Sequence, residues 1–486
     1  MIYKNYIKEI DKFIIENESE FIKDLDELMS IPSVSEDISE VTKSLHWCID
    51  KANSYGFKAE AILDNQIGII EMGEGDETLG ILTHVDVVSS GDESEWTYPP
   101  YKATVANGFV WGRGSCDDKG PLLNCLYAMR AVKKIGLPMH KKVQLIIGTQ
   151  EEVKWTDMDA FVANCKLPDY SFTPDGDFPI GNREKGYADV KLCFEKEIGT
   201  KGNIEITELY GGPTINSVPS EAHAFLKGSL EVIKEVLESY LHEHPENNIS
   251  VVEENEIIRV ESKGVAIHSS FPEKGVNAIW LLADFLMKLD LVNNGAYKVI
   301  KFINEIAKGD FEGKPFGLAR GNVYVNGEDM HKTMMSLTLL ETKNDQYDLY
   351  YNIRQTYGIC KSDIEAGFNL HKEKYQYTFS IVDYMDALYV DSNKPFVKLM
   401  EEIYNENTKW TSGFNLGHGT SYAKALPNAV YWGPVFPDED DLCHEVDERV
   451  KYNNMILATK LFSYYIAEIA FSEESFLLKK YKKEEK

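Results

Sequence analysis

Five separated segments of the sequence contain side chains that bind divalent metal ions well. Together they offer two imidazoles and several carboxylates, a mixture that suits a pair of zinc-like or manganese-like ions sharing a bridging carboxylate. Such a pair makes hydroxide from water at neutral pH, so these residues indicate hydrolysis. The segments are THVD (83–86), GRGSCDDKG (112–120), the doublet Glu151–Glu152, TPDGDFP (173–179) and HEVDE (444–448).

The first two segments place histidine and aspartate beside predicted elements. His84 and Asp86 follow an apolar stretch. The alternation of a strand puts both on one face, where Asp86 could orient a ligating His84. Asp117 lies in a loop just before a helix that begins near Lys119, and its carboxylate could bridge two ions. Taken alone, Asp117 and Asp118 would be interpreted as helix-capping residues.

The other three segments supply further carboxylates and the second imidazole. Glu151 and Glu152 end the second predicted strand. Adjacent carboxylates at a strand end point in different directions, so one can bind metal while the other takes a proton from water and passes it on. Asp175 lies in a turn-rich segment and His444 in a polar one. The ordinary interpretations are a solvated acidic pair, an Asx turn and an exposed loop. The occurrence of all five segments together favours a metal site.

The composition excludes several classes of partner. The 486 residues exceed a comfortable single domain, and 43% of them are apolar, enough to bury a core. The net charge of -28 argues against nucleic acid and anionic membrane as partners. No apolar run approaches the roughly 20 residues of a membrane span, and the N-terminal residues lack the apolar core of a signal peptide.

The seven cysteines are scattered and form no CxxC pair, which indicates reduced thiols and a cytoplasmic protein. Cys116 and Cys443 each adjoin a candidate ligand. Their irregular spacing favours small filler residues over thiolate ligands.

The first third of the chain alternates strand and helix patterns. Residues 79–88 and 142–148 are apolar, β-branched runs typical of central strands. Between them, residues 121–135 carry apolar side chains at helical spacing, and Gly136 ends that helix. This alternation predicts an α/β layer.

The pattern changes after about residue 184. Two long helices are predicted there, at 220–241 and 277–306, among strands at 257–262, 335–341 and 348–353, which indicates an α+β unit. After Lys394 the pattern returns to a helix (396–405), a glycine-rich loop (413–419), a short strand (429–433) and a final helix (450–471). Because the last ligand segment lies in this third part, the sequence predicts an inserted domain, 185–385, between two parts of one catalytic domain, 1–184 and 386–486. The tail from residue 477 is expected to be a frayed, solvated end.

Over residues 31–448 the segments resemble those of the zinc-dependent exopeptidases and amidohydrolases that include aminoacylase and succinyl-diaminopimelate desuccinylase. Details resemble the PepV-like bacterial dipeptidases more closely. These are the pair Asp117–Asp118 before KGP, the TPDGDFP segment followed by Glu184–Lys185–Gly186, and the length of the inserted region. The resemblance implies an α/β fold: a discontinuous two-zinc exopeptidase catalytic domain with an inserted α+β (ferredoxin-like) lid domain.

The resemblance also implies roles for individual residues. One ion would be held by His84, Asp117 and Asp175, and the other by Asp117, Glu152 and His444. Asp86 would orient His84, and Glu151 would be the general base and acid. In the inserted domain, His268 of GVAIHSSFPEKGVNA (264–278) would stabilise the oxyanion. The implied substrate-binding residues are Asn216 in GGPTINSVP, Arg354 in YNIR, and Gly419 and Thr420 in GHGTSYAK.

The sequence departs from the family pattern at two places. Gln150, Val153 and Lys154 flank the glutamate pair where the family usually has an acidic residue before it and a small residue and glycine after it. The GHGTSYAK loop has one extra residue. All the implied ligands and the base are present, so activity is expected.

The expected function is hydrolysis of dipeptides by a metal-activated water. Two divalent ions are expected, with zinc the default and manganese or cobalt accepted by the same ligands. The expected enzyme is a cytoplasmic monomer with a small peptide substrate. One alternative keeps the site but assigns it to an N-acyl amino acid deacylase or desuccinylase. Another is a non-catalytic, metal-stabilised binding protein, although Glu151 and His268 are both retained.

Overall fold

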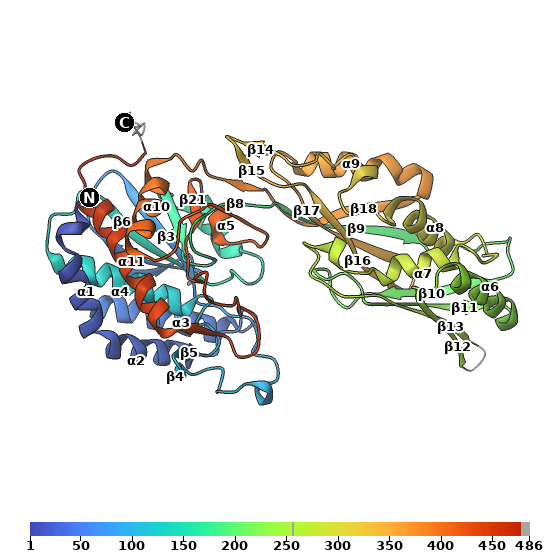
Figure 1. Cartoon of the computed structure of the whole chain (residues 1–486), viewed down its shortest axis with the longest axis horizontal. Coiled ribbons are helices and arrows are strands. Elements are labelled where there is room, and N and C mark those ends of the chain that lie inside the picture. The colour runs from blue at the N-terminus through green and yellow to red at the C-terminus, as the bar shows by residue number, and fades with distance from the viewer. Residues whose placement is uncertain (255–256, 478–486) are drawn as a thin grey trace. The chain divides into compact units, whose positions relative to one another are not determined.

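The computed structural model of the protein describes residues 1–254 and 257–477 (Figure 1). The chain divides into two compact units. Unit 1 comprises Met1–Glu184 and Tyr389–Lys486, and unit 2 comprises Lys185–Leu388. The tail expected to be frayed lies, from residue 478 onward, outside the described residues.

Unit 1 is built on a nine-stranded sheet with strand order β1-β2-β6-β3-β7-β21-β8-β19, in which β20 also pairs with β8. In its centre β3 runs parallel to both β6 and β7, and β21 runs parallel to β7. The carboxyl ends of these strands therefore meet at one edge of the sheet. The strands are β1 (Lys58–Ile62), β2 (Ile67–Met72), β3 (Thr78–His84), β6 (Lys142–Gly148), β7 (Tyr170–Thr173), β8 (Gly181–Glu184), β19 (Leu388–Tyr389), β20 (Asn415–Gly417) and β21 (Ala429–Tyr431).

Helices cover this sheet. Helix α4 packs closely against α11, and both are buried along most of their length because apolar residues occur on all sides. Helix α4 ends where Gly136 adopts φ 75°, the left-handed conformation that glycine adopts without strain. The helices of unit 1 are α1 (Ile7–Glu16), α2 (Glu18–Met29), α3 (Ile38–Ser54), α4 (Lys119–Ile135), α5 (Thr156–Asn164), α10 (Pro395–Asn407) and α11 (Tyr452–Phe471).

A small three-stranded sheet joins segments that are far apart in sequence. It has the order β22-β5-β4, from β4 (Thr104–Ala106), β5 (Phe109–Trp111) and β22 (Arg449–Lys451). Arg449 pairs with Trp111 in an antiparallel register. The pairing therefore holds residues 444–448 beside residues 112–118.

Unit 2 is an eight-stranded antiparallel sheet with the order β12-β13-β11-β10-β16-β17-β9-β18. Helices pack on it around one apolar core. Its strands are β9 (Tyr187–Glu195), β10 (Glu205–Gly211), β11 (Glu221–Lys227), β12 (Asn248–Glu254), β13 (Ile257–Lys263), β16 (Met334–Thr342), β17 (Gln346–Arg354) and β18 (Tyr377–Met385), with the separate hairpin β14 (Tyr324–Val325) and β15 (Glu328–Asp329). Its helices are α6 (Leu230–Glu243), α7 (Ala278–Leu286), α8 (Gly295–Phe302) and α9 (Lys361–Tyr375).

Two predicted helices are wrong in extent. The helix expected over 220–241 is strand β11 followed by α6. Residues 221–227 alternate exposed and buried side chains, the period of a strand, and Ser229 caps the helix by accepting from Val232 N. The helix expected over 277–306 is interrupted. Helix α7 ends at Leu286, and Asn294 caps a new helix by accepting from Tyr297 N.

The predicted α/β fold with an inserted α+β unit is confirmed. The strands expected at 142–148, 257–262, 335–341 and 348–353 are present as β6, β13, β16 and β17. The final helix begins at Tyr452 because Val450 belongs to β22. Among the described residues, no helix combines the length and apolar composition that crossing a bilayer requires.

Candidate metal centre

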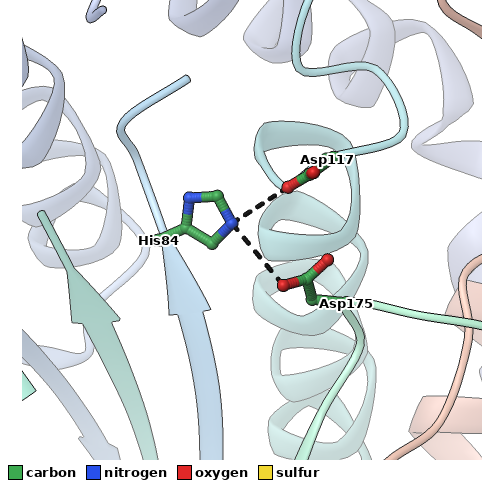
Figure 2. Close-up of side chains that lie close together, drawn as sticks. All are labelled: His84, Asp117 and Asp175. Atoms are coloured by element: carbon green, nitrogen blue, oxygen red, sulfur yellow. Dashed lines mark ion pairs between the residues drawn. The ribbon is translucent and has the colours of Figure 1, made fainter. Parts of the chain in front are cut away.

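The first imidazole lies at the carboxyl end of β3. His84 is the last residue of this strand, whose seven residues are all buried. Its Nε2 lies 3.0 Å from Asp117 Oδ1 and 3.8 Å from Asp175 Oδ2 (Figure 2). Asp175 follows β7, the parallel neighbour of β3. Parallel pairing therefore delivers the histidine and this aspartate to the same edge of the sheet.

The second imidazole faces the other oxygen of the same aspartate. His444 Nε2 lies 3.0 Å from Asp117 Oδ2 and 3.0 Å from Glu152 Oε1. Two groups of three potential ligands result, and within each group the ligand atoms lie within 4.8 Å of one another. Asp117 belongs to both groups, an arrangement in which one carboxylate can bridge two cations.

The electrostatics of this cluster favour cation binding. Burial, and then the negative charge of Asp117, raise the pKa of both Asp175 and Glu152 above the usual range. Hydrogen bonds with Asp117 and Glu152 raise the pKa of His444 to about 11. Glu151 Oε1 is buried, and no hydrogen-bond partner is found for it among the described residues. The carboxylates thus crowd together and take up protons when nothing else supplies positive charge, so the residues fit a divalent metal site.

Asp86 contacts both the first histidine and the turn that carries the two glutamates. It is fully buried, and its backbone carbonyl oxygen lies 2.9 Å from His84 Nδ1. A neutral imidazole that donates this hydrogen bond leaves Nε2 as the metal-binding nitrogen. The Asp86 carboxylate accepts hydrogen bonds from the backbone N–H groups of Glu151 and Glu152, at 3.2 Å each, and from Ser35 Oγ at 2.8 Å. One aspartate thus orients the histidine and the turn that carries both glutamates.

Glu448 was not singled out as a site residue from the sequence, yet it shapes the loop that carries Asp117. Its side chain is fully buried and pairs with Arg113 at 2.6 Å. Its Oε1 accepts from the backbone N–H groups of Cys116 at 2.8 Å and Asp117 at 3.2 Å, and both carboxylate oxygens lie 3.1 Å from Gly114 N. In the sequence, Glu448 is distinguished only by its place in the acidic run HEVDE (444–448), and such runs also occur in exposed loops.

Replacing Glu448 with glutamine is expected to destabilise the protein by about 3–5 kcal/mol, because Arg113 would keep a buried charge without its partner. Urea denaturation would measure the free energy of unfolding. The matched control is Glu445→Gln, which removes an exposed charge from the same segment and should change stability by less than about 0.5 kcal/mol. Equal effects of the two substitutions would contradict the assigned role.

A cavity of about 610 Å³ opens beside the cluster in unit 1. Asp117 and Asp175 line it, and so do Gly419 and Thr420, the residues predicted to bind substrate. Glu184 holds this loop in place, because its buried carboxylate accepts from Ser421 N at 3.2 Å and Ser421 Oγ at 2.5 Å. The loop therefore has a defined position at the cavity wall.

The three predicted site residues of unit 2 lie near one another within that unit. The backbone carbonyl of Asn216 accepts a hydrogen bond from Ser269 N at 2.9 Å, and Ser217 forms a β-bridge with His268. Asn352 Oδ1 accepts from Ser269 Oγ at 2.8 Å and from Arg354 Nε at 3.2 Å.

Burial, and then the charge of Arg354, lower the pKa of His268 below its ordinary value. The imidazole is therefore neutral at pH 7 and retains one N–H that can donate to an anion.

Comparison with known proteins places this chain among peptidases. A family model described as "Peptidase family M20/M25/M40" matches residues 80–468. The "Putative dipeptidase YtjP" of Bacillus subtilis (strain 168) is 30% identical over 473 residues, covering 94% of this chain and 98% of that protein. A relative described in the same way from Staphylococcus haemolyticus is 29% identical and covers 92% of this chain and 96% of its own length.

Solved structures share the fold. The dipeptidase Dug1p of Saccharomyces cerevisiae superposes with a TM-score of 0.60 at 14% identity, over 96% of this chain and 99% of that one. The aminoacylhistidine dipeptidase of Vibrio alginolyticus gives a TM-score of 0.58 at 14% identity, over 93% and 96%.

Proposed function

Because the chain belongs to peptidase family M20/M25/M40, we propose that it is a dipeptidase that hydrolyses its substrate with two divalent cations. The single observation that carries this proposal is the placement of Asp117 between two imidazoles, 3.0 Å from each, with one carboxylate oxygen toward either ring. The names of the relatives, which are described as dipeptidases, support the choice of substrate.

The proposed ligand sets follow the two side-chain groups. His84, Asp117 and Asp175 would hold one cation, and Asp117, Glu152 and His444 the other. Zinc suits this mixture of imidazole and carboxylate, and manganese or cobalt would accept the same ligands. When bound, two such cations polarise a substrate carbonyl and lower the pKa of water to near neutrality.

Glu151 is the proposed proton-transfer residue. Burial, and then the charge of Asp175, raise the pKa of Glu151 well above its usual value in the metal-free protein. Cations in the neighbouring sites would lower it again, because positive charge favours the carboxylate. A carboxylate balanced in this way can take a proton from the attacking water and return it to the leaving amine. Its backbone N–H is fixed by Asp86, so the side chain starts from a defined position.

The substrate-binding residues are proposed on their chemistry. Arg354 carries a guanidinium fork, which suits the free carboxylate of a dipeptide. His268 can donate to the oxyanion of the tetrahedral intermediate through Nε2–H, because its Nδ1 accepts from Ser270 N at 3.2 Å. Asn216 lies beside it in unit 2, while Gly419 and Thr420 offer a backbone N–H and a hydroxyl at the cavity wall. We further propose that the enzyme is a cytoplasmic monomer.

The decisive experiment compares free dipeptides with their N-acetylated forms. The metal-loaded protein is expected to release amino acids from a broad panel of dipeptides, and to cleave each N-acetyl dipeptide far more slowly. Amino acid release is measured by chromatography. Rapid release of acetate or succinate from N-acyl amino acids, with dipeptides left intact, would show a deacylase instead. A protein that binds metal and cleaves neither class would be a binding protein.

A further inference from the structure

Two cysteines meet beside the metal centre. Cys116 Sγ and Cys443 Sγ are 3.1 Å apart, although 327 residues separate them in sequence. Antiparallel pairing of β5 with β22 and the hydrogen bonds of Glu448 hold the two segments together. These contacts therefore hold the loop that carries Cys443 beside the loop that carries Cys116.

The two thiols differ in access. Cys443 is half-buried and lines the 610 Å³ cavity, whereas Cys116 is 3% exposed. A small reagent that enters the cavity would meet Cys443 first and leave Cys116 as the second, resolving thiol. No other pair of thiols makes a sulfur–sulfur contact in residues 1–254 and 257–477.

We propose that Cys116 and Cys443 form a modification site at which hydrogen peroxide produces a disulfide. The Cys443 sulfur attacks one peroxide oxygen, the O–O bond breaks, and water leaves with a sulfenic acid remaining on Cys443. The Cys116 sulfur then attacks the Cys443 sulfur, and the S–S bond forms as the S–O bond of the sulfenic acid breaks. The hydroxyl group leaves with the Cys116 thiol proton as a second water. Two thiols and one peroxide become one disulfide and two waters. A disulfide requires the sulfurs to approach to about 2.05 Å.

The location of the pair gives this reaction a consequence. Cys116 directly precedes Asp117, and Cys443 directly precedes His444. A disulfide would tie the segment of the shared carboxylate to the segment of the second imidazole. Restricting the separation of the two segments is expected to slow the release of cations to a chelator. This consequence rests on the proposed function, whereas the formation of the disulfide does not depend on it.

The test treats the full-length, metal-loaded, pre-reduced protein with hydrogen peroxide and maps its peptides without reduction. The expected result is the loss of two of the seven free thiols and a cross-linked peptide pair containing Cys116 and Cys443, both reversed by dithiothreitol. Cys116→Ser and Cys443→Ser should each abolish the cross-link. Cys360→Ser, which removes an exposed thiol of unit 2, should retain it.

The readout separates this inference from the proposed function, because peptide mapping needs no catalytic activity. Oxidation of Cys443 to sulfinic acid without a cross-link would overturn the proposal, and so would two thiols that stay reduced. If either serine variant fails to fold, the peptide map of the wild-type protein still decides. Faster cation release after cross-linking would overturn the proposed tethering of the two segments.

Discussion

Replacing Glu151 with glutamine is expected to lower the turnover of a dipeptide at least ~100-fold while both cations stay bound. Glutamine has nearly the same shape but cannot take a proton from water or return it to an amine. The side chain belongs to neither group of potential ligands, so metal content should not change. Initial rates give kcat and KM, and elemental analysis gives the number of cations per chain.

Glu152→Gln is the matched control for this prediction. The two glutamates are adjacent, and Asp86 fixes both backbone N–H groups at the same distance. Only Glu152 faces His444, at 3.0 Å, so Glu152→Gln should lower the bound metal as well as the rate. A Glu151→Gln protein with full turnover would refute the assigned proton transfer, and one that has lost a cation would make Glu151 a ligand.

Substituting asparagine for Asp117 is expected to remove both cations together and abolish detectable hydrolysis. Each oxygen of this carboxylate faces a different imidazole, so its loss weakens both sites at once. Asp175→Asn, which alters one group only, should leave the other site with measurable affinity. Titration calorimetry with zinc or manganese would count the sites. Two intact sites in Asp117→Asn would contradict the bridging arrangement.

Removing the cations from the wild-type protein with a chelator should lower its thermal stability, by an amount that depends on pH. Each cation present at a hundred times its Kd stabilises the folded state by about 2.7 kcal/mol, so removing both should lower the thermal midpoint.

The decrease in the thermal midpoint on chelation should be larger at pH 8 than at pH 6. Asp175, Glu151 and Glu152 have folded-state pKa values above their unfolded values, and those of His84 and His444 are raised as well. The metal-free native state therefore binds more protons than the unfolded state, and its stability falls as pH rises through these values. Asp117, whose pKa is lowered, contributes stability that is lost only at acidic pH. A thermal midpoint that does not change when the chelator is added would refute the metal site.

Local pattern was sufficient for part of the fold. The run at 142–148 is apolar and β-branched, and it forms β6 with the expected bounds. The helix ending at Gly136 was likewise predictable, because a glycine after an apolar helical pattern accepts the left-handed conformation at little cost. The wrong helix at 220–241 had mixed signals. Residues 221–227 alternate with a period of two, and the neighbouring strands β10 and β13 determine their conformation by pairing with both edges of β11.

The amino-acid sequence by itself determined which side chains are available for chemistry: imidazoles and carboxylates at the ends of predicted elements, in an order that resembles one family. The tertiary structure alone decided the distances between them. Parallel pairing of β3 with β7 brings Asp175 to His84, and β22 pairing with β5 brings His444 to Asp117. The role of Glu448 and the contact of Cys116 with Cys443 arise only from this second pairing. These two contacts span more than three hundred residues and leave no local periodicity, and the family resemblance did not include them, so neither was predicted from the sequence.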